Sequence, residues 1–481
     1  MAPSAALSLV LLSGCANKGA EQRIHLATQA EVDAVLPREL VVEPPVDAAA
    51  RKRSRDFHAE LDRLGGAKMQ SFGIPLGLLL ASSPGKPSSK VKVQALVPAM
   101  AFYKAHAATI ARISKILSAG SMQPDPTVRE TTEGVRRELE VTELIRLVLI
   151  CAEAEFDRGD YESGKAFILL GINIGDRYLE ASDGVWGYLL AVLIRGIGSA
   201  GTERVARNPK VPLDTLRQIL GALHASTVVD EPLIRSMRLD FQRITRRELA
   251  VNPIGLYRSL DKAEQSLRSN PNKLADFDAS SNPPSGTLDA VETARKCGER
   301  VMEELANLRR PFSESDFSSE DAARQSVDQI LTVHNDASPS DPILPNPEAA
   351  RTPLTKDEFN SRMNSGHNTM GRAICYGFLT DQVTMRNSLQ GRVNVNATRV
   401  LLASAIYRRT HGGALPPTID GFLPILGKWP VDAFNGKPMI YRAKQEKVYS
   451  VGEDLKDDGG SFTWDGTRVR DVGLSLSLTG R

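Results

Sequence analysis

The chain contains few aromatic residues and few cysteines for its length. Aromatic residues make up 5% of 481 residues, so the core must be built mainly from Leu, Ile, Val and Ala, which favours packed helices over sheets. Its 4 cysteines form no CxxC pair, and no disulfide framework is expected. The 60 basic and 58 acidic residues leave a net charge of +2, which excludes a broad positive field for nucleic acid.

Recognisable catalytic motifs are also missing. The 7 histidines include no HxH or HxxxH pair, and the chain has no Walker loop, GxSxG or HExxH motif. The segment Gly196-Ile-Gly-Ser-Ala-Gly201 matches GxGxxG, but the apolar run before it is long enough for a helix. We interpret these glycines as small packing residues, because a dinucleotide site needs a strand before them and an acid about 20 residues later.

The N-terminus indicates export. Residues 1–14 are apolar and small, and Leu12-Ser-Gly-Cys15 resembles the lipobox of bacterial lipoprotein signal peptides, which implies that Cys15 is lipidated after cleavage. An ordinary apolar N-terminal helix is the alternative. No later segment contains the ~18 consecutive apolar residues of a membrane span. We therefore expect the protein in the cell envelope, periplasmic or at the outer membrane, held to the membrane only by this N-terminal lipid.

Apolar periodicity and proline content divide the chain into segments. We expect a signal segment at 1–15, a tether at 16–49, a helical domain at 50–333, a Pro-rich linker at 334–354 and an α+β domain at 355–481. In the helical domain, apolar spacing predicts a hairpin of two helices, Glu138 to Phe156 and Tyr161 to Tyr178, turned by Asp157-Arg-Gly-Asp160. The very apolar segment from Val185 to Ala200 predicts a central, buried helix.

The C-terminal domain should combine a long helix with a small sheet. Apolar spacing predicts a helix from Val393 to His411, which Gly412 and Gly413 end. The short alternating segments Met439 to Arg442 and Lys447 to Val451 predict an antiparallel hairpin. The fold class expected for the whole chain is therefore mainly α, a helical bundle or hairpins, followed by a small α+β domain with a long helix and a short antiparallel sheet.

An acidic, glycine-rich loop follows this hairpin. Asp454, Asp457 and Asp458 supply three carboxylates within a few positions, and Gly459 and Gly460 allow the chain to curl tightly. Calcium prefers six to eight oxygen ligands on such a loop, so we expect a structural calcium site with these three aspartates as ligands. The alternative is a solvated acidic turn in which water and Lys456 relieve the repulsion between the carboxylates.

The C-terminal motifs occur in a known order. The helix ending in Ile406-Tyr-Arg-Arg-Thr-His-Gly-Gly413 is followed by Pro430-Val-Asp-Ala-Phe-Asn-Gly-Lys-Pro438, Tyr449-Ser-Val-Gly452 and the acidic loop. Over about 393–462 this resembles the globular domain of the major pseudopilin of type II secretion. That resemblance implies a helix leading into a small sheet and a calcium ion that stabilises the loop. The whole chain resembles large bacterial exported, lipoprotein-like proteins that carry the same tail.

These observations favour a non-enzymatic scaffold that binds protein partners, with a pseudopilin-like domain stabilised by calcium. Two alternatives stay open. An envelope hydrolase could assemble a dispersed site in the helical domain, since catalytic groups can come together from distant parts of a chain. An accessory component of a secretion or pilus-like assembly could dock through the C-terminal domain.

Overall fold

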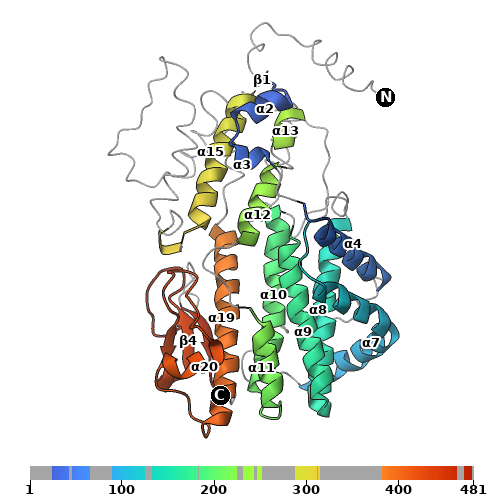
Figure 1. Ribbon diagram of the computed structural model, residues 1–481, viewed down its shortest axis with the longest axis vertical. Helices are drawn as coiled ribbons and strands as arrows, with labels where there is room; N and C mark the ends of the chain where they lie inside the picture. Colours follow the sequence, from blue (N-terminus) through green and yellow to red (C-terminus); the bar gives the residue numbers. More distant parts are fainter. Residues whose placement is uncertain are drawn as a thin grey trace. The chain divides into compact units, whose positions relative to one another are not determined.

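The computed structural model of the chain is shown in Figure 1. The structure describes residues 24–42, 46–64, 89–124, 133–182, 184–224, 231–242, 246–251, 288–310, 312–314, 382–462 and 471–478. These residues are mainly helical, with a small antiparallel sheet near the C-terminus, which confirms the predicted fold class. They belong to two compact units. The first unit draws on segments 1–43 and 238–305, and the second on 44–237, 306–318 and 381–481.

The first unit contains short elements and one longer helix. Its described elements are β1 (Ile24–His25), α2 (Gln29–Val35), α3 (Arg38–Val41), α13 (Arg246–Val251), β2 (Leu288–Asp289) and most of α15 (Ala290–Leu308), with β1 and β2 parallel. Helix α2 lies in the segment expected to be a tether. It starts there because Thr28 and Glu31 form a capping box. The Arg246 guanidinium then holds Asp33 of α2 through two hydrogen bonds of 2.6 and 2.8 Å.

The second unit is built on long helices. They are α4 (Ala48–Arg63), α7 (Ser89–Ser118), α8 (Glu133–Arg158), α9 (Tyr161–Glu180), α10 (Gly184–Arg207), α11 (Leu213–Ala222), most of α12 (Glu231–Asp240) and α19 (Gln382–Thr410). Helices α8 and α9 form the predicted hairpin, which the structure confirms. Gly159 turns the chain with a positive φ of 81°, and Asp160 then caps α9 by accepting a 3.0 Å hydrogen bond from the Ser163 N–H.

Small residues allow α9 and α10 to approach closely. A Cβ atom added at Gly175 of α9 would lie 2.9 Å from the Arg195 Cα of α10, and one at Gly198 would lie 3.3 Å from the Gly171 carbonyl oxygen. The GxGxxG segment therefore lies inside α10 and not at a helix end. Gly198 and Gly201 pack against neighbouring helices, as expected of small packing residues, whereas a Cβ at Gly196 would meet no atom within 4 Å. The predicted central helix is confirmed as α10, which continues to Arg207.

Helix α19 packs against the small sheet of the second unit. After α19 come η8 (Ile419–Phe422), α20 (Leu423–Leu426), β3 (Ile440–Arg442), η9 (Ala443–Gln445), β4 (Lys447–Ser450) and β5 (Val472–Ser475). The three strands pair antiparallel in the order β3-β4-β5, with Tyr441 opposite Val448 and Val448 opposite Leu474. The predicted hairpin is therefore confirmed. Helix α19 packs against α10 and also against β4 and β5 (Figure 1).

Two cysteines differ in their chemistry. Cys151 is buried in α8, and burial raises the pKa of its thiol to about 12, so it is an unreactive core residue. Cys297 is buried in α15 and is disulfide-bonded. The sequence did not predict this bond, because no cysteine spacing pointed to a bonded pair.

Candidate functional site

The acidic loop begins directly after strand β4. Gly452, Gly459 and Gly460 have φ angles of 69°, 73° and 76°, so glycine supplies the left-handed backbone at both ends of the loop. Leu455 also has a positive φ, 59°, which is uncommon for a residue with a branched side chain. These angles fold the loop back toward the sheet, and the Lys447 Nζ of β4 donates a 2.7 Å hydrogen bond to the Gly460 carbonyl.

Asp457 is held by protein groups on several sides. It accepts hydrogen bonds of 2.8 Å from the Tyr449 hydroxyl, 3.0 Å from the Gly459 N–H and 2.6 Å from the Arg442 guanidinium. Burial opposes ionisation of Asp457, but these three hydrogen bonds and the positive charge of Arg442 outweigh it and hold the pKa of the carboxyl below its ordinary value. Asp457 is therefore a stable anion within the loop, and it forms an ion pair with the Arg442 guanidinium.

The other two aspartates expected to bind calcium differ in their exposure. Asp454 is half-buried and accepts a 3.1 Å hydrogen bond from the Lys456 N–H, and Asp458 is exposed. Across the described residues, no group of three or more His, Cys, Asp or Glu side chains is arranged to hold a metal ion. The structure therefore places the three aspartates on one loop without bringing their carboxylates together.

A fourth acid, Asp471, lies directly before β5 and was not predicted from the sequence. The residue is 1% exposed, and its Oδ2 accepts hydrogen bonds of 2.7 Å from the Gly460 N–H and 3.3 Å from the Ser461 N–H. Its Oδ1 is buried and has no hydrogen-bond partner in the part of the chain that the structure describes. One signal in the sequence could have identified Asp471: it is an acidic residue directly before Val472, the apolar first residue of β5.

Burial and a neighbouring charge both disfavour ionisation of Asp471. Burial raises its pKa above the ordinary value, and the negative charge of Asp457 acts in the same direction, whereas backbone N–H groups of the loop oppose them. Asp471 therefore links β5 to the acidic loop, with an electrostatic cost that a nearby cation would reduce.

A fifth acid, Asp432, connects the segment Pro430–Pro438 to the segment Tyr449–Gly452. It is 1% exposed. Its Oδ1 accepts hydrogen bonds of 2.6 Å from the Ser450 hydroxyl and 2.8 Å from the Phe434 N–H, and its Oδ2 accepts one of 3.0 Å from the Val451 N–H. Burial raises the pKa of Asp432. This carboxyl joins the turn at 432–437 to the end of β4, where the acidic loop starts.

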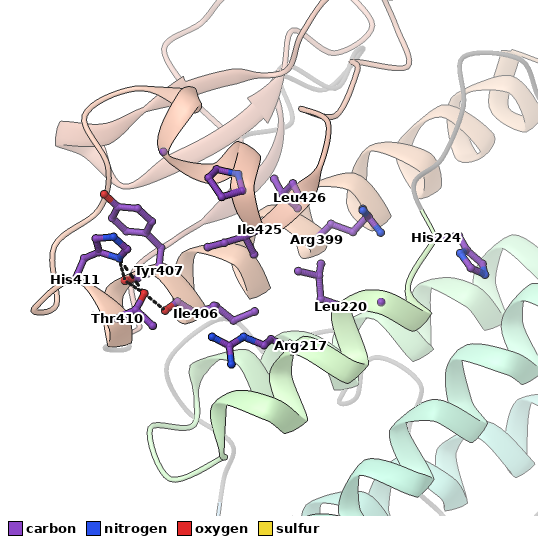
Figure 2. Close-up of a pocket in the computed structure, with 13 residues that line it drawn as sticks. Arg217, Leu220, His224, Arg399, Ile406, Tyr407, Thr410, His411, Ile425 and Leu426 are labelled. Carbon is purple, nitrogen blue, oxygen red and sulfur yellow. Dashed lines mark hydrogen bonds between the residues drawn. The ribbon is translucent and has the colours of Figure 1, made fainter.

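A separate cleft of about 830 Å³ lies between α11, α19 and α20 (Figure 2). Polar side chains from α11 and α19, and from the residues just after each helix, reach it. They are Arg217, His224, Arg399, Tyr407, Thr410 and His411. None of the described residues that line the cleft is acidic. The sequence analysis did not identify this cleft, because its two sides lie far apart in the chain.

Cys15, the expected site of lipidation, lies outside the described residues. Among the helices that the structure describes, none is both long enough and apolar enough to cross a membrane. Comparison of the chain with protein-family models, with curated proteins and with solved structures found no match.

Proposed function

We propose that this protein is exported, is anchored through a lipid on Cys15, and acts as a non-enzymatic scaffold for protein partners. We also propose that a calcium ion stabilises its C-terminal domain. The observation that supports calcium is the buried carboxylate of Asp471, which bonds the acidic loop with one oxygen and leaves the other without a partner among the described residues. That oxygen is a fourth candidate ligand beside Asp454, Asp457 and Asp458.

The electrostatics of the loop favour a divalent cation. Asp471 is buried and lies close enough to Asp457 for the charge of Asp457 to raise its pKa. Two carboxylates in this relation repel each other when both are ionised, and a hard cation with oxygen ligands relieves the repulsion. Carbonyl groups of the glycine-rich loop would complete the coordination. We expect an affinity on the order of 0.1–1 mM, as in extracellular calcium modules.

Arg442 balances part of this charge without the metal. Its guanidinium is 2.6 Å from Asp457 and receives further support from the Tyr449 hydroxyl at 3.1 Å. Calcium would compete with this ion pair, and the pair is solvent-exposed, so it contributes little stability on its own. The competition is a physical reason for the weak affinity that we expect.

Calcium should therefore raise the melting temperature of the full-length protein. With a Kd near 0.5 mM, about 5 mM calcium stabilises the folded state by about 1.4 kcal/mol. For a chain of this length, this corresponds to an increase of roughly 1–2 °C. Asp471→Asn should abolish the increase, and without calcium it should melt at the same temperature or higher, because it removes a charge that burial disfavours.

The matched control is Asp420→Asn, which removes an exposed carboxylate of the same unit outside the loop and should keep the full calcium response. The double variant Asp457→Ala with Asp458→Ala should also lose the response. Differential scanning calorimetry with and without calcium measures the melting temperatures of the wild type and of each variant. A wild-type melting temperature that does not change in 10 mM calcium would rule the site out.

Two further observations support the rest of the proposal. Helix α19 packs against an antiparallel sheet that follows it in the chain, and this order supports the resemblance to the pseudopilin domain. It also supports the second candidate, an accessory component of a secretion or pilus-like assembly. The disulfide at Cys297 supports export, because disulfides persist mainly in oxidising compartments.

A further inference from the structure

We propose that the cleft between α11, α19 and α20 binds an amphiphile with one anionic head group and an aliphatic body. The shared chemistry of such ligands is a carboxylate or phosphate joined to an alkyl chain. This site is separate from the acidic loop, and it does not depend on the calcium proposal. Three features of the cleft support it: its cations, the lack of acidic side chains among its described lining residues, and its apolar side chains.

The central cation is Arg399 of α19. One of its guanidinium nitrogens donates a hydrogen bond to the Leu223 carbonyl, at the end of α11. Arg399 is half-buried, and this burial lowers the pKa of its guanidinium. It forms no ion pair with any carboxylate of the described residues, so its remaining N–H groups are available to an anion. Arginine binds carboxylate and phosphate oxygens well, because its N–H groups form a planar fork.

A second cation and two imidazoles extend the polar lining. Arg217 of α11 pairs with Asp214 at 2.9 Å, but both side chains are largely exposed, so this pair competes weakly with a ligand. In Figure 2, His224 and His411 lie at opposite ends of the lining, with Arg217 and Arg399 between them. His411 stacks on the Tyr407 ring with 3.9 Å between the ring centroids. The head group would therefore bind near the two arginines.

The rest of the lining is apolar. It includes Leu220, Ile406, Pro424, Ile425 and Leu426. Leu220, Ile406 and Leu426 are 6%, 2% and 8% exposed, so these lining side chains are fixed by packing in the core. A volume of about 830 Å³ lies within the range of small-molecule sites, which are mostly apolar with a few oriented polar groups. An alkyl chain would contact these apolar side chains, and a free inorganic anion has no group that could do so.

The test uses the full-length protein and isothermal titration calorimetry with four probes. They are decanoate, decyl phosphate, decanol and inorganic phosphate. We expect decanoate or decyl phosphate to bind, the tighter one identifying the head group, and decanol and inorganic phosphate to bind at least tenfold more weakly. Equal binding of decanol would show an apolar cleft without anion recognition, and equal binding of phosphate would show a simple anion site. Either result would overturn the proposal. So would a finding that neither decanoate nor decyl phosphate binds at 5 mM.

Variants then locate the binding. Arg399→Gln should weaken binding by at least tenfold, because a charged hydrogen bond is lost, while Lys444→Gln removes an exposed charge outside the cleft and should change nothing. A second pair of variants leaves Arg399 in place, so a folding defect caused by its loss cannot affect the result. Gly221 lines the cleft, and a Cβ there meets no atom within 4 Å, so both Gly221→Asp and Gly221→Asn fit. The Asp variant should bind at least tenfold more weakly than the Asn variant, and equal affinities would contradict the site.

Discussion

At the scale of single residues, buried carboxylates organise the C-terminal part of the second unit. Asp432 and Asp471 are each 1% exposed, and both accept hydrogen bonds from the acidic loop or from the residue just before it. The sequence points instead to the acids of the loop, because clustered carboxylates form a pattern that is visible in a sequence. Burial is a property of the folded chain, so the importance of single, dispersed aspartates could not be predicted.

Asp432→Ala should destabilise the protein strongly. The change leaves the Phe434 and Val451 N–H groups and the Ser450 hydroxyl without their acceptor, at a cost of about 3 kcal/mol. Ser450→Ala removes only one of these hydrogen bonds and should cost about 1 kcal/mol. Urea denaturation at pH 7 measures both free energies of unfolding. Equal, small effects of the two variants would show that the carboxyl does not join the turn to β4.

The penalty of Asp432→Ala should also depend on pH. Burial raises the pKa of Asp432 above its ordinary value of 3.8, so the folded protein holds this proton more tightly than the unfolded chain does. The contribution of the group to stability is therefore largest below pH 3.8 and falls as the pH rises through the folded pKa. The difference in unfolding free energy between wild type and Asp432→Ala should be larger at pH 4 than at pH 7, and the opposite trend would contradict the assignment.

At the scale of elements, helical periodicity predicted most of the second unit. The hairpin α8–α9, the buried helix α10 and the β3–β4 hairpin agree with the predicted elements, because long apolar patterns specify one secondary structure well. Helix α2 was not predicted, since its apolar pattern is short and its capping box was overlooked. The close packing of α9 on α10 could not be predicted either, because many helical glycines have no packing role.

Two glycines of the second unit should respond differently to the same substitution. Gly175→Ala would place a Cβ 2.9 Å from the Arg195 Cα and force α9 and α10 apart, which should cost 1–3 kcal/mol. Gly196→Ala meets no atom within 4 Å and should stabilise α10 by up to about 1 kcal/mol, because alanine is the better helix former. Thermal unfolding followed by circular dichroism measures both. If Gly175→Ala were as stable as the wild type, the close contact would be absent.

At the scale of the whole molecule, the proposed lipid anchor would decide where the protein resides in the cell. The chain combines a lipobox-like Leu12-Ser-Gly-Cys15 with a disulfide at Cys297. Cys15→Ser should shift the protein from the membrane fraction to the soluble fraction after cell lysis and ultracentrifugation. Cys151→Ser is the matched control, because this cysteine is a buried core residue and its loss should leave the distribution unchanged. Equal membrane fractions for wild type and Cys15→Ser would contradict lipid anchoring.

The amino-acid sequence alone determined the helical character, the small C-terminal sheet and the position of the acidic loop. These features depend on local periodicity, turn residues and composition, which a linear chain displays directly. Only the tertiary structure decided that Asp471 is buried against the loop, and that segments near 217–224 and 399–426 enclose one cleft. Burial and the meeting of distant segments arise from packing, and no local pattern in a single sequence encodes them.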